Sequence, residues 1–156
     1  MAKKGGGPNA PVNNLANNGV YVLMDEITMQ SCADCLKWIM NQNLAETRLP
    51  QLTIIINSPG GDVHAAFALI DTMKASTIPI KTVGLGLIAS CGFLIFIAGK
   101  KGSRILTPNT SILSHQYSWG SAGKEHELYA RVKEFELSTQ RMIEHYKKCI
   151  GMSEKQ

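Results

Sequence analysis

A single serine interrupts the most apolar stretch of the chain, residues 86–98. Ser90 follows a strand-like run and precedes a helix-like run, with the small residues Ala89 and Gly92 around it. This pattern predicts a strand that turns sharply into a helix inside a hydrophobic core. The hydroxyl either caps the helix or is a nucleophile held where the first helical amides stabilise negative charge. Taken alone, the stretch favours the cap, because serine is common at helix starts.

Two strand, turn and helix units indicate an α/β fold with a mainly parallel sheet. The β-branched run 52–57 shows no alternation, which is typical of a strand buried on both faces of a parallel sheet. It ends at the turn 58–61, and a helix is predicted over residues 63–74. The run 80–87 is the next strand and leads into Ser90. Because sites in such sheets form beyond the carboxyl ends of the strands, both turns are expected at one edge.

The other segments give the expected domain plan. Residues 1–19 are rich in glycine, proline and asparagine and are predicted to form a flexible arm. A head domain is expected over residues 20–121, followed by a long helix over 122–150 and a chain end over 151–156. Within the head, further elements are predicted: a strand at 20–24, a helix at 29–44, and strands at 104–106 and 111–114.

A narrow apolar stripe runs through the last third of the chain. Its members recur every three or four positions: Leu128, Val132, Phe135, Thr139, Met142, Tyr146 and Cys149. They predict a helix of about 26 residues, roughly 39 Å long at 1.5 Å per residue. Such a helix is longer than packing on a small sheet requires. We therefore expect it to protrude and to pack against its counterpart in another subunit.

Composition limits the classes of protein. A chain of 156 residues with 44% apolar content fits one globular domain. The apolar run 85–98 is too short to cross a bilayer, and the first residues carry no secretory signal, so a cytoplasmic location is expected. The net charge of +4 comes from scattered lysines and arginines without interleaved aromatics, which does not favour nucleic acid.

The cysteines do not predict a metal or redox centre. Cys32 and Cys35 form one C-x-x-C pair, but no second pair exists and the four histidines do not complete a ligand set. The pair falls within the amphipathic pattern of residues 29–44, so we interpret it as two small, half-buried thiols. Neither a metal nor a cofactor is expected.

Acyl transfer by Ser90 would need a base and amides that face the oxyanion. Among the four histidines, His115 ends a predicted strand, so it would emerge on the same edge as Ser90, although a structural role remains an equal alternative. The Gly60–Gly61 pair and the Cys91 amide are candidate oxyanion donors. By itself, Ser-Pro-Gly-Gly is an ordinary turn sequence.

Several short motifs occur together, in an order and at spacings that are specific. They are Ile-Asn-Ser-Pro-Gly-Gly at 56–61, Asp-Thr-Met at 71–73, Ala-Ser-Cys-Gly at 89–92, Ala-Gly-Lys-Lys-Gly at 98–102 with Arg104, Pro108-Asn109 and His115-Gln116. From about Val20 to its end, the chain resembles the proteolytic subunit of the caseinolytic (Clp) protease, the ClpP family of the ClpP/crotonase superfamily. The resemblance implies a layered ββα-type superhelix with mainly parallel strands and a protruding handle helix.

The resemblance also implies the chemistry and the partners. Ser90 is the expected nucleophile, His115 its general base, and Gly61 and Cys91 the donors of the oxyanion-hole amides. The expected substrate-binding residues, which hold the peptide as an added strand, are Gly60, Asp62, Val63, Gln116 and Tyr117. The expected protein is a serine endopeptidase in which two heptameric rings stack into a 14-subunit chamber, and an AAA+ ATPase feeds it unfolded polypeptides.

Three departures from the family pattern define the alternatives. The catalytic aspartate of the family lies beyond the handle helix, whereas this sequence ends at Gln156, so the chain is either a fragment or a variant without that acid. The N-terminal arm lacks the apolar pattern of the axial loop, and Tyr117 replaces the usual proline. The alternative functions are a non-catalytic or impaired ring subunit and, less favoured by the Ser90 and His115 pair, a crotonase-type acyl-CoA enzyme.

Overall fold

The structure, a computed structural model, describes residues 15–115 and 120–152. Within these ranges, the strands are β1 (Val20–Leu23), β2 (Leu52–Ser58), β3 (Ile80–Ala89), β4 (Arg104–Leu106) and β5 (Ser111–Leu113). The helices are α2 (Met29–Leu44), α3 (Val63–Ala75), α4 (Cys91–Ile97) and α5 (Glu125–Ile150). All strand pairs are parallel, in the order β1-β2-β3-β4, with β5 beside the second half of β3. The predicted α/β class and its parallel sheet are confirmed.

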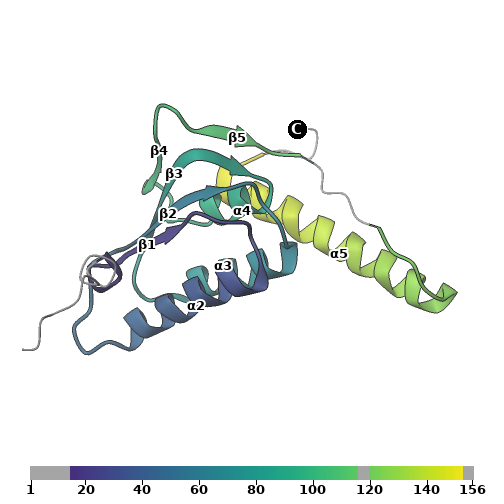
Figure 1. Cartoon of the computed structure of the whole chain (residues 1–156), viewed down its shortest axis with the longest axis horizontal. Helices are drawn as coiled ribbons and strands as arrows, with labels where there is room; N and C mark the ends of the chain where they lie inside the picture. The colour runs from purple at the N-terminus through teal and green to yellow at the C-terminus, as the bar shows by residue number, and fades with distance from the viewer. Residues whose placement is uncertain (1–14, 116–119, 153–156) are drawn as a thin grey trace, which may run out of the picture.

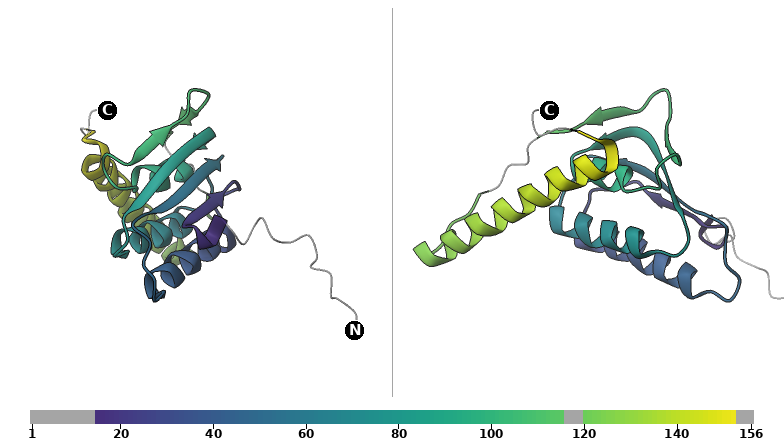
Figure 2. Two further views of the ribbon diagram at one scale, coloured as in Figure 1. Left: turned by 90° about the vertical axis from the view of Figure 1, so that its left-hand side faces the viewer. Right: turned by 180° about the vertical axis from the view of Figure 1, so that it is seen from behind.

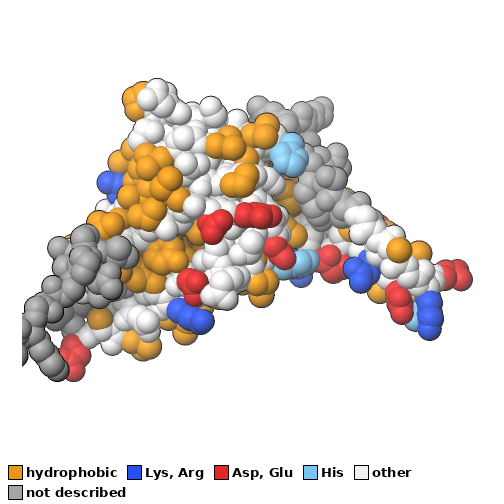
Figure 3. All heavy atoms as spheres, viewed as in Figure 1, with side chains coloured by type: hydrophobic (Ala, Val, Ile, Leu, Met, Phe, Trp, Pro, Cys, Tyr) orange, Lys and Arg blue, Asp and Glu red, His pale blue; other side chains and the backbone are white. Residues whose placement is uncertain are grey.

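The helices α2, α3 and α4 cover one face of the sheet (Figures 1 and 2). Buried and half-buried residues therefore alternate along β2, with Ile54 and Ile56 fully buried and Ile55 half-buried. The prediction that this strand is buried on both faces is wrong, because residues 15–115 and 120–152 cover only one of them. Exposed apolar side chains remain on the other face (Figure 3). Among them are Val22 and Ile105, because Val22 pairs with Ile55 in β2 and Ile105 pairs with Val83, the partner of Ile55 in β3.

The described part of the predicted flexible arm, residues 15–19, is not free of the fold. Residues 15–17 form a helical turn that leads into β1. The carbonyl of Ala16 accepts hydrogen bonds from Trp38 Nε1 and Gln42 Nε2 of α2, both at 3.2 Å. A Cβ on Gly19 would lie 2.8 Å from Leu49 Cδ1, so this turn packs closely on the head. Residues 1–14 of the predicted arm lie outside the described residues.

Helix α2 begins at a capping box, in which Ser31 N–H donates to Thr28 Oγ1 and Thr28 N–H donates to Ser31 Oγ. Its Cys32 and Cys35 are fully buried rather than half-buried, and burial raises the pKa of Cys32 to about 11. Both thiols are free and pack as core side chains. In the described ranges, no three His, Cys, Asp or Glu residues form a metal-binding group, and no helix is long and apolar enough to cross a membrane.

Helix α5 has 26 residues, and its N-terminal end projects away from the head (Figure 1 and the right view of Figure 2). This confirms the predicted protrusion. The C-terminal half packs on the head, with Met142, Tyr146 and Cys149 against the core. Arg104 fastens this end, because its Nη1 donates to the carbonyl of Cys149 at 2.7 Å and its Nε to the carbonyl of Gly99 at 2.8 Å. Part of the apolar stripe therefore contacts the chain's own head.

His145 is the buried titratable group of this contact, with 3% of its surface exposed. Its Nε2 lies 2.9 Å from the carbonyl of Leu94 in α4, so this nitrogen carries the proton and donates it. Its Nδ1 accepts from Lys74 Nζ at 3.4 Å. Burial, above all, lowers the pKa of His145, and the Lys74 ammonium acts in the same direction. The folded state therefore holds the neutral imidazole.

We expect the free energy of unfolding to fall as the pH drops below about 6.5, the ordinary histidine pKa that the unfolded chain keeps. Below this pH, the unfolded state binds a proton on the histidine and the folded state does not. The free energy of unfolding then falls by up to about 1.4 kcal/mol per pH unit. Above that pH, this contribution is fully present. Urea unfolding between pH 5 and 8 should show a steeper acid loss for the wild type than for His145→Gln. A His126→Gln variant, at an exposed site of the same helix, should retain the wild-type slope, and parallel curves for all three would contradict the assignment.

Candidate active site

The chain turns sharply after β2, at Gly60 and Gly61. Both residues have positive φ angles, +99° and +145°, a backbone conformation that residues other than glycine rarely adopt. The turn is fixed by Ile27, whose N–H donates to the carbonyl of Gly60 at 2.8 Å and whose carbonyl accepts from Asp62 N–H at 2.7 Å. The buried Ser58 hydroxyl also accepts from Gly60 N–H at 3.1 Å. These hydrogen bonds fix the backbone of Gly60 and Gly61, which together are called the glycine corner.

Ser90 lies at the turn from β3 into α4 and has φ 50° and ψ −120°. In the described ranges it is the one residue other than glycine with positive φ. Its side chain makes no capping hydrogen bond to α4, which removes the helix-cap explanation. A non-glycine residue held in this conformation costs of order 1–3 kcal/mol, and such strain occurs at functional sites. The hydroxyl therefore lies beside the Cys91 thiol without capping α4.

The glycine corner packs directly against Ser90. A Cβ on Gly60 would lie 2.7 Å from Ser90 Cβ and 3.3 Å from the amide nitrogen of Cys91. In the described ranges, the amides of Gly61 and Cys91 donate to no backbone carbonyl. Both are thus available to a ligand beside the hydroxyl. The role of these amides as oxyanion donors to a substrate stays a prediction.

The thiol next to Ser90 is not an alternative nucleophile. Cys91 is 3% exposed, and its Sγ donates to the carbonyl of Gly61 at 3.2 Å. Burial raises the pKa of Cys91 above its ordinary value. Because the thiolate is the reactive form, the thiol is inert here and serves to hold the glycine corner.

A cavity of about 330 Å³ opens beside Ser90. One wall comes from the head, with Gly61, Val63 and Cys91, and the opposite wall comes from α5, with Phe135 and Met142. Phe135 and Met142 belong to the apolar stripe that predicts contact with another subunit. In the structure, both residues line the cavity that holds Ser90. The cavity can therefore hold one side chain of an extended peptide against the apolar side chains of Phe135 and Met142.

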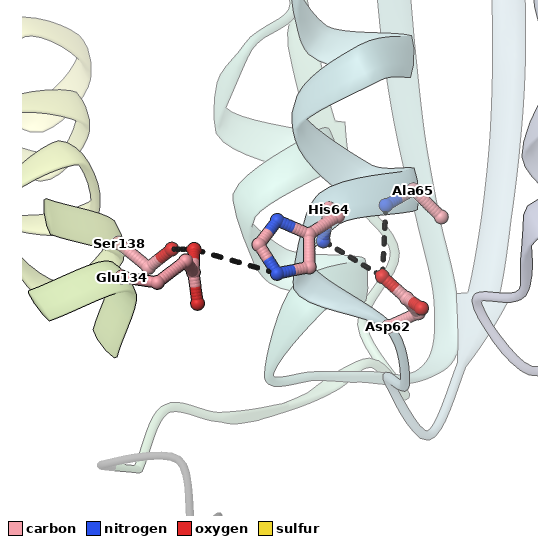
Figure 4. Close-up of polar contacts among 5 residues, drawn as sticks. All are labelled: Asp62, His64, Ala65, Glu134 and Ser138. Atoms are coloured by element: carbon pink, nitrogen blue, oxygen red, sulfur yellow. Dashed lines mark hydrogen bonds and ion pairs between the residues drawn. The ribbon is translucent and has the colours of Figure 1, made fainter. Parts of the chain in front are cut away.

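Polar residues from α3 and α5 face each other across this cavity (Figure 4). His64 Nε2, in the first turn of α3, lies 3.5 Å from Glu134 Oε1 of α5, and Ser138 Oγ donates to the same oxygen at 2.7 Å. Asp62, predicted to bind substrate, has its carboxylate engaged as the N-cap of α3, where it accepts from the amides of His64 and Ala65 at 2.7 and 2.9 Å. The Asp62 backbone is engaged as well, because its N–H donates to the carbonyl of Ile27 and its carbonyl accepts from Ala66 N–H at 3.1 Å.

His115 follows β5 at the same edge of the sheet as Ser90. The last pair of the ladder joins Ala89 to Leu113, and Ser90 N–H donates to the carbonyl of Leu113 at 2.8 Å. His115 is exposed and is not among the described residues that line the cavity. The structure therefore brings the two chain segments together. It does not show a contact between the two side chains.

Some site residues were not found from the sequence, and others are not described. Gln116 and Tyr117, predicted to bind substrate, lie outside the described residues. The residues that sequence reasoning missed are Arg131, Glu134, Phe135 and Met142 of α5 and His64 of α3. The signal for the helix residues was their spacing of three, four and seven positions, which places them on one face of α5. No sequence pattern pointed that face toward Ser90.

Comparison with known proteins gives consistent matches. The model of the Clp protease family matches residues 5–156. The ATP-dependent Clp protease proteolytic subunit 1 of Corynebacterium jeikeium is 35% identical over 85% of this chain and 68% of its own length. The subunit of the same name from Chlamydia abortus is 34% identical over 83% of this chain and 68% of its own.

A solved structure has the same fold. A mutant of ClpP1 from Listeria monocytogenes superposes with a TM-score of 0.77 at 28% identity, and the match covers 91% of this chain and 78% of that chain. Across six curated relatives, this chain spans 52% to 68% of the relative's length. The predicted fold with a handle helix is thereby confirmed.

Proposed function

The chain belongs to the Clp protease family, and from that premise we propose that it is a serine endopeptidase subunit that hydrolyses peptide bonds of unfolded proteins. One observation carries the proposal. A serine with φ 50° that does not cap its helix packs against the glycine corner, beside two amides that donate to no backbone carbonyl in the described ranges. A nucleophile and an oxyanion hole need this combination.

The proposed mechanism uses groups at one edge of the sheet. His115 takes the proton of Ser90 as the hydroxyl oxygen attacks the peptide carbonyl. The amides of Gly61 and Cys91 donate to the resulting oxyanion. The tetrahedral intermediate collapses, and the leaving amine takes the proton from His115. Water, activated by the same histidine, then hydrolyses the acyl-enzyme and restores Ser90.

Substrate is proposed to bind as an extended strand along the glycine corner. The peptide would lie between Gly60, Asp62 and Val63 on one side and Gln116 and Tyr117 on the other. A side chain next to the scissile bond would enter the cavity against Phe135 and Met142, which favours apolar side chains.

The proposed assembly follows the family. Seven copies form a ring, two rings stack through α5 into a closed 14-subunit chamber, and an AAA+ ATPase delivers unfolded polypeptides in the cytoplasm. The protruding N-terminal end of α5 supports this, because Tyr129 is 66% exposed and Val132 is 39% exposed. The head, at residues 20–121, would form the ring, and residues 122–150 would form the contact between rings.

One observation favours the second candidate, a ring subunit without activity of its own. His115 is absent from the described lining of the cavity that contains Ser90. The test separates the two candidates. The full chain is sized by sedimentation velocity, and each species is assayed with a short fluorogenic peptide. Hydrolysis by a ring-sized species is expected, whereas rings that cleave nothing would overturn the peptidase and support the inactive subunit.

A further inference from the structure

Tyr146 of α5 contacts two segments of the head, one next to Ser90 and one next to His115. The phenol oxygen of Tyr146 lies 3.1 Å from Ser114 Oγ. Ser114 is the residue between β5 and His115. The ring of Tyr146 lies 6.0 Å from that of Phe93, centroid to centroid, at an interplanar angle of 37°.

Phe93 connects this ring to the nucleophile. It lies in the first turn of α4, and its N–H donates to the carbonyl of Ser90 at 3.0 Å. Tyr146 therefore touches, through its ring, the turn that holds Ser90 and, through its hydroxyl, the segment that leads to His115. No element of the head makes both contacts through a single described side chain.

The position of Tyr146 is fixed by its neighbours on α5. His145, immediately before it, is buried and bonded to the carbonyl of Leu94 at 2.9 Å. Cys149, one turn later, is held through its carbonyl by Arg104 at 2.7 Å. Burial raises the pKa of Tyr146, so its hydroxyl stays protonated and can share a hydrogen bond with Ser114 at neutral pH. The phenol is thus a rigid support.

The segment that it supports is weakly held by comparison. Strand β5 has three residues, all exposed, and its ladder with β3 ends at Leu113. Ser114 and His115 follow the last ladder pair and are exposed as well. A short edge segment of this kind gains little positional order from the sheet alone. The bond from Tyr146 acts one residue before His115.

We propose that Tyr146 is a positioning residue for the Ser90 and His115 pair, acting through its hydrogen bond to Ser114 and its ring contact with Phe93. The inference rests on the proposed function. It assigns to α5 a role within its own subunit, in addition to the contact between rings. The hydroxyl sets the place of the base, and the ring sets the place of the turn that carries the nucleophile.

Tyr146→Phe and Ser114→Ala test this directly, because each removes one hydroxyl and the first keeps the ring. The kcat and KM for a fluorogenic peptide and the rate of fluorophosphonate labelling are measured for both single variants and the double variant. We expect each single variant to lose about 3- to 10-fold in kcat and in labelling rate, as for one hydrogen bond, with KM and melting temperature unchanged. The double variant should lose no more than either single one.

Two further variants serve as controls. Ser114→Thr retains a hydroxyl and should keep most of the activity. Tyr21→Phe removes a phenol hydroxyl on β1, at the far end of the strand order, keeps the ring that packs on Trp38, and should have no effect. Full activity in Tyr146→Phe, or losses that add in the double variant, would overturn the positioning role alone. A wild type that neither cleaves peptide nor reacts with the probe would overturn the proposed function, and the positioning role with it.

Discussion

Ser90→Ala is expected to lower peptide hydrolysis by at least about 10⁴-fold, because removing the nucleophile of a serine hydrolase leaves only oxyanion stabilisation and binding. The variant should fold normally, since alanine at φ 50° meets the same backbone strain as serine and Ser90 makes no capping bond that could be lost. The measurement is kcat/KM for a fluorogenic peptide, together with the melting temperature.

Ser90→Gly sharpens this test. Glycine adopts φ 50° freely, so relief of strain should offset its greater flexibility in the unfolded chain, leaving this variant at least as stable as Ser90→Ala while equally inactive. Ser111→Ala, at an exposed serine of β5, is the matched control and should keep wild-type activity. Residual hydrolysis above about 1% of wild type in either Ser90 variant would place the nucleophile elsewhere.

Gly60→Ala is expected to cause the second largest loss, about 100-fold or more in kcat/KM, together with a lower melting temperature. The added methyl group would lie 2.7 Å from Ser90 Cβ and 3.0 Å from the carbonyl oxygen of Ala89, so either the corner or the serine must move. The shift would displace the neighbouring oxyanion amides, and loss of one such donor costs about 10²- to 10³-fold. Peptide kinetics and thermal unfolding measure the two effects.

Gly102→Ala separates steric displacement from backbone strain. Gly102 has φ +84°, close to the +99° of Gly60, but a Cβ there would meet no atom within 4 Å. We expect this variant to lose stability by about 1–2 kcal/mol, the cost of a left-handed residue, and to keep its activity while folded. Equal activity losses in the two variants would show that the corner acts only through general stability.

Local patterns of the sequence predicted the elements well. The helix over 29–44 and the start of the helix at Val63 are found where predicted, because apolar spacing and turn residues act within a few positions. The fold class and the approach of Gly60 to Ser90 followed from the rule that the carboxyl ends of parallel strands share an edge.

Long-range packing set the limits of that prediction. The apolar composition of 52–57 does not reveal that the described helices cover only one face of the sheet. Ile55 is half-buried because it lies on the other face. The stripe on α5 does not reveal which part returns to the head, so the cavity wall formed by Phe135 and Met142 was missed. The Tyr146 to Ser114 bond joins segments 32 positions apart, and no local pattern indicates it.

The central claim is that the hydroxyl of Ser90 is an activated nucleophile at the glycine corner. Its most direct test is to incubate the full chain with a fluorophosphonate probe and to locate the adduct by peptide mass spectrometry. The account predicts one adduct, on Ser90, formed far faster than on other serines, slowed strongly by His115→Ala and absent in Ser90→Ala. An adduct on another residue, or no adduct from a folded, ring-sized protein, would contradict it.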